Sequence, residues 1–256
     1  MARPTEQDAG AAGPSSLGKA LALLDAFTAT SPELSIRELS RRAGVARSTT
    51  HRLVGELVAW GALERTRDGV RLGVKLFELG TLAPSSITLR EAALPFAHHL
   101  HEVTRLTVNV AIRDGGEIVY LDKISSAALT VPHSRQGGRN PAHATGLGKA
   151  ILAFDDPVAL DDLLAAPLEA VTPKTIVDPD ALRAELARVR EQRVAYDVEE
   201  SRLGLFCVAA PILDPRGRAV GAVSVTGATA LDEAQRFAPA VRTTALAIAG
   251  RLRRRS

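Results

Sequence analysis

The chain has 256 residues, a length that suits one large domain or two ordinary ones. Its 46% hydrophobic and 24% charged residues are normal for a globular protein, and no apolar run approaches the roughly 18 residues of a membrane helix. The N-terminus lacks the layout of a signal peptide, and Cys207 is the single cysteine, so an intramolecular disulfide is excluded. A cytoplasmic protein is therefore expected.

The formal net charge of +3 is unevenly distributed along the chain. Nine basic and four acidic residues lie between Arg37 and Lys75, whereas sixteen basic and twenty acidic residues lie between Glu91 and Gly250. A basic front on a mildly acidic body suggests that the front meets a polyanion, although a merely solvated face would show the same pattern. Residues 1–15, rich in Gly, Ala, Pro and Ser, are expected to be disordered.

Residues 17–60 have the signals of three helices. Apolar residues at helical spacing predict a helix over 17–27. Ser35 and Glu38 form the pattern of a capping box, which predicts a second helix that ends before Gly44, a residue suited to a left-handed helix end. A third helix is expected over 47–60. Two short helices joined by a glycine turn are typical of a helix-turn-helix, whose second helix enters the DNA major groove.

The start of the third helix has a polar cluster that a helix packed into a core does not need. Because the apolar positions from Thr50 to Leu57 face inward, the polar residues project outward along the first turn and a half. Arginine can pair with guanine acceptors, and hydroxyls can contact phosphates or bases, whereas any single residue here could also belong to a solvated helix start. The predicted DNA-reading residues are Arg47, Ser48, Thr49, His51 and Arg52.

A hairpin follows the third helix. Two short alternating stretches flank an R-D-G turn, which is a hairpin signal. A hairpin in this place is a wing, and its Arg65, Arg67 and Arg71 are expected to reach phosphates or the minor groove. Residues 16–73 are therefore predicted to form a winged helix-turn-helix domain, followed by a linker helix over 74–87.

The remaining residues, 88–256, mix helices with strands. Helical patterns cover 88–106, 149–154, 180–192 and 232–253, and strand patterns cover 107–112, 117–121, 129–131, 207–212 and 219–225. Helices at both ends of an antiparallel sheet indicate an α+β layer domain, whereas a doubly wound parallel sheet is disfavoured by the mixed order.

The GLGKA stretch at 146–150 is close to a phosphate-binding loop but departs from it. The Walker pattern needs glycine where His143 stands and a hydroxyl residue where Ala150 stands, so nucleotide binding is not expected. Thr145 nevertheless precedes a helix start, where free backbone N–H groups attract carboxylates.

Metal and covalent chemistry have weak signals. His98 and Glu102 share a helix face next to His101, yet no second ligand cluster follows, so no metal and no cofactor are expected. Cys207 lies among apolar residues as a core thiol would, and no Gly-x-Ser-x-Gly elbow is found, so no catalytic residues are assigned and an enzyme is not expected.

Several separate stretches resemble, in order and spacing, the IclR family of bacterial transcriptional regulators. They are SIRELSRRAGVARSTTHRLVGEL (35–57), RLGVKLFELG (71–80), HATGLGKAIL (143–152), YDVEESRLGLFCVAAPI (196–212) and GRAVGAVSVTG (217–227). The resemblance spans roughly residues 17–250. It implies a winged helix-turn-helix joined by a helix to a GAF-like α+β effector-binding domain, homodimers or dimers of dimers (homotetramers), and small organic acids or aromatics as effectors.

The resemblance also implies where an effector binds. The positions that match the family's pocket are Gly146, Leu147, Asp197, Leu205, Cys207, Ser224 and Thr226, with Leu129 and Pro132 as apolar wall. With Thr145 at the helix start, these residues favour a small carboxylate. Asp197 argues against an anion because like charges repel, so a neutral or hydroxylated aromatic is the rival ligand.

The resulting functional expectation is a ligand-responsive DNA-binding transcriptional regulator, a repressor in the first instance, on a palindromic operator. An enzyme built on the α+β body with a DNA-binding appendage is the alternative, but no matched nucleophile and base can be assembled for it. A ligand-independent DNA binder is a further alternative, but it would leave residues 88–256 without a function. The pattern does not name the effector, and it does not separate repressor from activator.

Overall fold

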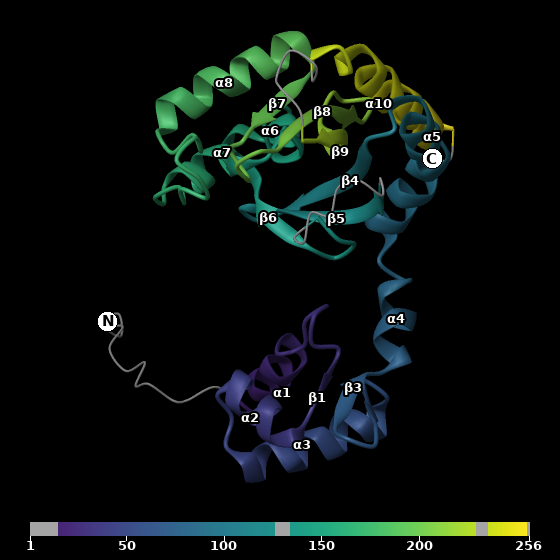
Figure 1. Cartoon of the computed structure of the whole chain (residues 1–256), viewed down its shortest axis with the longest axis vertical. Helices are drawn as coiled ribbons and strands as arrows, with labels where there is room; N and C mark the ends of the chain where they lie inside the picture. Colours follow the sequence, from purple (N-terminus) through teal and green to yellow (C-terminus); the bar gives the residue numbers. More distant parts are fainter. Residues whose placement is uncertain (1–14, 126–133, 229–234, 255–256) are drawn as a thin grey trace, which may run out of the picture. The chain divides into compact units, whose positions relative to one another are not determined.

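The computed structural model describes residues 15–125, 134–228 and 235–254, and it divides into two compact units, Met1–Ala83 and Pro84–Ser256 (Figure 1). The two units are described separately below. Among the helices described, none has both the length and the apolarity that crossing a bilayer requires.

The N-terminal unit is a three-helix cluster with a small antiparallel sheet. Its elements are α1 (Ser16–Asp25), β1 (Glu33–Leu34), α2 (Ile36–Ala43), α3 (Arg47–Trp60), β2 (Leu63–Arg65), β3 (Val70–Leu72) and α4 (Val74–Gly80). The sheet order is β1-β3-β2, so the expected wing hairpin gains a third strand that the sequence did not signal. Leu23, Leu39, Leu53 and Val54 are fully or almost fully buried between the helices, as the helical spacing predicted.

The two predicted ends of α2 are found, with one difference. Ser35 Oγ accepts a hydrogen bond from the Glu38 N–H at 3.2 Å, and Gly44 ends the helix in the left-handed region at φ 64°. The Glu38 carboxylate does not return to the Ser35 N–H but accepts hydrogen bonds from Arg41 and Arg42. The capping box is therefore half-formed, because two neighbouring guanidinium groups compete for its acid.

The base of the wing is joined closely to the end of α3. The Gly73 N–H donates to the Ala62 carbonyl at 2.8 Å. A Cβ atom at Gly73 would lie 2.1 Å from the Gly61 carbonyl oxygen, so only glycine permits this approach. The end of α3 and the base of the wing are thus connected by backbone contact without intervening side chains.

The C-terminal unit is built on one six-stranded antiparallel sheet. Its strands are β4 (Thr107–Asp114), β5 (Glu117–Ile124), β6 (Arg139–Pro141), β7 (Ala195–Val198), β8 (Phe206–Leu213) and β9 (Ala219–Gly227), in the order β6-β5-β4-β9-β8-β7. Its helices are α5 (Pro84–Thr104), η1 (Ala142–Ala144), α6 (Gly146–Leu152), α7 (Pro157–Leu164), α8 (Pro179–Gln192) and α10 (Ala238–Arg253).

The two faces of this sheet are covered by different helices (Figure 1). Val208, Val223 and Val225 face α5 and α10 in one apolar core. Ala209 and Ala222, on the alternate positions of the same strands, face α6 and α8 in a second core. The α+β layer prediction is confirmed.

Several element bounds differ from the sequence-based ones. The helix expected from residue 88 begins at Pro84, since proline is favoured in a first helical turn, and it continues through Pro95. The helix expected from Lys149 begins at Gly146, and α7, β6 and β7 lacked a clear pattern. The strand expected at 129–131 lies outside the described residues.

Gly148 permits α6 to pack against η1, and its replacement tests that packing. A Cβ at this position would lie 2.0 Å from the Ala142 carbonyl oxygen, so Gly148→Ala must displace backbone. We expect the free energy of unfolding of the C-terminal unit to fall by about 3 kcal/mol in urea denaturation followed by circular dichroism.

Gly250→Ala is the matched control, because its Cβ would lie no closer than 3.7 Å to its nearest neighbour, Arg253. Within a helix that substitution should stabilise by roughly 0.5–1 kcal/mol. Equal stability of Gly148→Ala and wild type would contradict the close packing.

Candidate DNA-reading face and effector pocket

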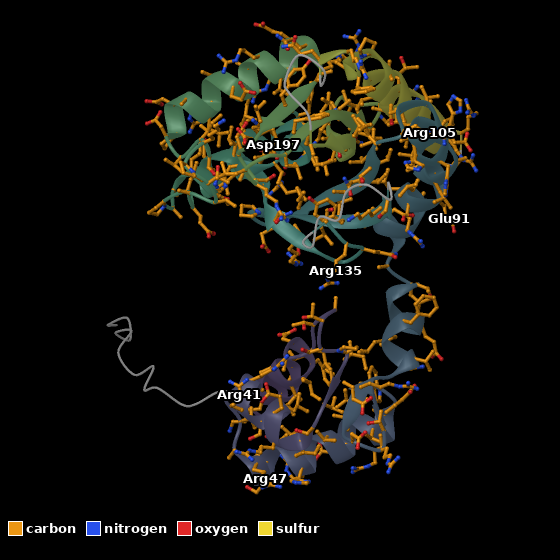
Figure 2. All side chains as sticks on the ribbon, in the orientation of Figure 1. Arg41, Arg47, Glu91, Arg105, Arg135 and Asp197 are labelled. Atoms are coloured by element: carbon orange, nitrogen blue, oxygen red, sulfur yellow. The ribbon has the colours of Figure 1, made fainter. Side chains whose placement is uncertain are left out.

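The polar cluster at the start of α3 lies on the outside of the N-terminal unit. Arg47, Ser48, His51 and Arg52 are exposed and Thr49 is half-buried. Figure 2 shows Arg47 at the outer surface of the helix. The N-cap residue, Ala46, offers no side-chain hydrogen bond, so the first backbone N–H groups of α3 are uncapped by side chains. The helix therefore presents arginines, hydroxyls and open donors together, which suits a polyanion.

The candidate arginines differ in whether they already form an ion pair with an acidic residue. Arg71 donates to Glu64, its cross-strand neighbour, at 2.8 and 2.9 Å, and Arg52 pairs with Glu56 at 2.5 Å. Both ion pairs are exposed, so each is weak and can be exchanged for a phosphate. Arg47, Arg65 and Arg67 have no acidic partner within the described residues, and all three are exposed. These three are therefore available to a polyanion.

A second site is a small cavity in the C-terminal unit, about 50 Å³ in volume. Six of the predicted effector residues line it: Thr145, Leu147, Asp197, Leu205, Cys207 and Thr226. Six further lining residues were not predicted: Asn109, Tyr120, Ser134, Asn140, Ser201 and Arg202. Leu129 and Pro132, the predicted apolar wall, lie outside the described residues.

The pocket wall follows from strand register. Asp197 is paired with Cys207 across β7 and β8, and Cys207 is paired with Thr226 across β8 and β9. Directly opposed residues of antiparallel strands point to the same face, so these three side chains form one row. The row lies on the face covered by α6, which places Thr145 and Leu147 opposite it.

Two predicted residues do not line the cavity. Ser224 lies one pair deeper along β9, opposite Asn109 and Ala209, and is fully buried. Gly146 packs against β7 and β8, where an added Cβ would lie 3.3 Å from the Cys207 sulfur. Both residues lie on the pocket side of the sheet, next to the residues that line the cavity.

Asp197, which is labelled in Figure 2, accepts hydrogen bonds that shape the turn following β7. Oδ1 accepts hydrogen bonds from the N–H groups of Glu200 at 2.8 Å and Ser201 at 3.2 Å, and Oδ2 accepts one from Ser201 Oγ at 2.5 Å. Burial raises the pKa of this carboxyl, and the hydrogen bonds from Ser201 act against the rise. Its role in the turn weakens the objection that Asp197 repels an anion.

Other pocket groups are neutral hydrogen-bonding groups. Burial raises the pKa of the Cys207 thiol to about 12 and also raises the pKa of Tyr120, so both stay protonated. Asn140 Nδ2 donates to the Tyr120 hydroxyl at 3.0 Å. Asn109 Nδ2 donates to Thr226 Oγ1 at 3.3 Å, whereas Asn109 Oδ1 is buried without a hydrogen-bond partner among the described residues. The pocket therefore offers an unused acceptor at its base.

Arg202 is the one cation that the described lining contributes. It is exposed, and no described side chain hydrogen-bonds to its guanidinium group. It was not predicted as a pocket residue, because a residue in a turn has no periodic pattern to mark it.

Lys149 explains why GLGKA resembles a phosphate loop without being one. Its side chain is 1% exposed, and Nζ lies 2.5 Å from Glu200 Oε1 and 3.7 Å from Glu185 Oε1. Burial raises the pKa of Glu200, and the Lys149 charge opposes that rise. The lysine thus anchors the turn after β7 and is not available to a phosphate.

The histidines of α5 do not form a cluster: His101 is hydrogen-bonded to the backbone, and His98 and His99 are exposed. His101 Nδ1 hydrogen-bonds with the Leu106 carbonyl at 2.7 Å, and His99 Nδ1 lies 3.9 Å from Glu102. Within the described parts of the chain, no three metal-binding side chains cluster.

Comparison with known proteins identifies the family of each unit. Residues 16–67 match the IclR helix-turn-helix domain, and residues 81–250 match the bacterial transcriptional regulator IclR C-terminal domain. The chain therefore belongs to the IclR family of bacterial transcriptional regulators, as the sequence motifs predicted. It is a DNA-binding transcriptional regulator with an effector-binding domain.

Named relatives cover most of the chain. It is 35% identical over 224 residues to the HTH-type transcriptional regulator XynR of Escherichia coli (strain K12), covering 86% of this chain and 89% of that one. It is 32% identical over 217 residues to the transcriptional repressor IclR of the same organism, covering 83% and 79%. An IclR homolog from Microbacterium hydrocarbonoxydans, solved with 4-hydroxybenzoate, matches with a TM-score of 0.85 and 30% identity over 94% of this chain and 100% of that one.

Removal of the Lys149 charge should expose its role as an anchor. Lys149→Met leaves Glu200 buried without a counter-charge, so the free energy of unfolding should fall by roughly 3–5 kcal/mol. Adding Glu200→Leu should recover part of that loss, because the uncompensated charge is gone. Urea denaturation of the full chain measures both.

Arg183→Ala is the control, since it removes an exposed pair with Asp161 and should cost under about 1 kcal/mol. Equal losses in Lys149→Met and Arg183→Ala would show that the buried pair is not an anchor.

Proposed function

We propose that this protein is a cytoplasmic repressor that binds a palindromic operator as a homodimer or a dimer of dimers, and that a small organic acid controls it. The observation that carries the proposal is one chain with an arginine-bearing helix start that no side chain caps, and a small pocket with unused polar groups in a separate unit. A regulator needs both, since ligand and operator must bind the same molecule.

The DNA contacts divide by chemistry. Arg47 and Arg52, at the start of α3, are placed to read base edges, and Ser48, Thr49 and His51 supply further donors. Arg65 and Arg67 of the wing contact backbone phosphates, and Arg71 does so after release from Glu64. A single helix-turn-helix reads one half-site, so two copies on a palindrome give the affinity a regulator needs.

The ligand chemistry follows from the two unused groups of the pocket. Arg202 at its edge favours a carboxylate, because guanidinium and carboxylate form paired hydrogen bonds. Asn109 Oδ1 at its base favours a hydroxyl donor on the same molecule. A hydroxylated organic acid satisfies both, and the 4-hydroxybenzoate bound to the Microbacterium homolog is of this class. Arg202 replaces the start of α6 as the expected carboxylate partner, because Thr145 Oγ1 already caps Gly148 there.

The remaining predicted pocket residues complete the shape. Leu147, Leu205 and Cys207 supply apolar wall, while Thr226 adds a hydroxyl. We retain Leu129 and Pro132 as further wall and Gly146 and Ser224 as its support. The ligand shifts operator binding by no more than its difference in affinity for the two states of the protein.

Operator binding should depend on Arg47 and Arg52. Losing a base-reading arginine should cost roughly 1–3 kcal/mol and relax specificity at one position, whereas losing a phosphate contact should weaken all sequences and flatten the salt slope. Arg47→Ala and Arg52→Ala are to be compared by fluorescence anisotropy at several salt concentrations. The duplex is one that the wild-type protein has selected from a random library.

Arg183→Ala, on α8 of the other unit, is the charge-matched control and should bind like wild type. Unchanged affinity and unchanged salt slope in both test variants would remove α3 from the DNA interface.

Acid recognition is tested with 4-hydroxybenzoate and its methyl ester in calorimetry. The acid should bind the wild-type protein more tightly than the ester, because the ester cannot pair with Arg202. Arg202→Leu should weaken acid binding by roughly tenfold or more and abolish the difference between acid and ester. Thr226→Val should weaken both ligands alike.

Arg183→Leu controls for a general loss of positive charge in the same unit. Equal affinity for acid and ester in the wild-type protein would refute an anionic effector. If Arg202→Leu still bound the acid more tightly than the ester, a residue other than Arg202 would have to be the partner of the carboxylate.

A further inference from the structure

A second cavity in the C-terminal unit is larger than the effector pocket and is not used by the proposed function. Its volume is about 210 Å³, and it lies along α10, beside the end of β8 and the turn that leads to β9. None of its lining residues is shared with the effector pocket.

Three arginines line this cavity: Arg193, Arg242 and Arg253. All three are exposed, and none forms a hydrogen bond or ion pair with another described residue through its guanidinium group. The lining holds one acid, Asp214, whose Oδ1 accepts hydrogen bonds from the N–H groups of Arg216 at 2.8 Å and Arg218 at 2.9 Å. The cavity therefore has a net positive charge with its cations unpaired.

The middle of the cavity is apolar. Arg242, Leu246 and Arg253 follow one another at intervals of four and seven residues, so they lie on one face of α10. The two arginines are about 16 Å apart along the helix axis. Leu246 is 58% exposed between them, and Pro211 and Leu213 of β8 line the facing side. The arrangement is an apolar groove with cationic ends.

Arg193 stands at a position that ordinarily favours another residue. It ends α8 in the left-handed region at φ 54°, where glycine or asparagine is preferred. The left-handed backbone would thus be less strained with glycine than with arginine, whereas the arginine side chain contributes a charge to the groove.

We propose that this groove binds a small organic dianion with charged ends and an apolar middle, at a site separate from the effector pocket. Guanidinium groups bind carboxylates and phosphates in paired hydrogen bonds, so two or three of them select an anion with more than one charged group. Pro211, Leu213 and Leu246 contact the apolar part of that ligand. Binding links the end of α8 to α10 and the β8–β9 turn.

The test uses octanedioate, a dicarboxylate with six methylene groups, and the full-length protein in calorimetry. Octanedioate should bind more tightly than octanoate. The double variant Arg193→Gly with Arg242→Ala should weaken octanedioate binding by roughly tenfold or more. Arg193→Gly alone should not lower the melting temperature, because glycine relieves the left-handed backbone, so its loss of binding is not a loss of folding.

Two controls separate this site from its surroundings. Arg216→Ala removes an exposed arginine of the same turn that does not line the groove, and it should bind octanedioate like wild type. Thr226→Val, in the effector pocket, should also leave octanedioate binding intact, so that this proposal and the effector proposal fail separately.

Four results would overturn the dianion site. They are no binding of octanedioate at millimolar concentration, equal affinity for octanoate, an equal loss in Arg216→Ala, or a loss in Thr226→Val. A fifth is a change of molecular mass in sedimentation caused by the double variant, which would assign the groove to a second copy of this chain.

Discussion

The pocket depends on the register of β7, β8 and β9. Because Asp197, Cys207 and Thr226 are directly opposed, they point to one face and form the wall that α6 covers. A shift of one residue would turn these side chains toward α5 and α10 and expose apolar residues to the pocket. The two apolar cores fix the register, since each face of the sheet has its own set of buried side chains. Ligand chemistry thus rests on core packing.

Buried charged groups also hold the turn that borders the same pocket. Lys149 holds Glu200, and Asp197 receives the N–H groups of Glu200 and Ser201, so the turn that carries Arg202 is fixed at three points. Thr175 adds a fourth contact by donating to the Glu200 carbonyl at 2.7 Å. These groups are far from water, where electrostatic interactions are strong and unpaired partners are costly. The backbone next to Arg202 is therefore held in place, while the Arg202 side chain stays exposed.

The N-terminal unit was predictable because its signals are local. Ser35, Gly44 and the spacing of Leu53 and Val54 define helices within a few residues of themselves. Apart from Thr145 at a helix start, the expected pocket positions came from the family resemblance, and two of those, Gly146 and Ser224, do not line the cavity. Asn109 was missed because strand pairing brings it to Thr226, 117 residues away, and no local pattern encodes that contact. Lys149 made GLGKA a near match to a phosphate loop, which His143 and Ala150 argued against; that the lysine is buried was not visible in so short a motif.

The backbone contact between Gly73 and the end of α3 has a consequence for operator search. A wing that swung freely would lose conformational freedom on reaching DNA, and each ordered residue would reduce the affinity. Here the glycine contact orders the base of the wing during folding, before any encounter. The helix and the base of the hairpin are therefore already ordered relative to each other when they meet the duplex. The entropy of ordering the base of the wing has already been lost in the free protein, which favours fast capture of a matching sequence.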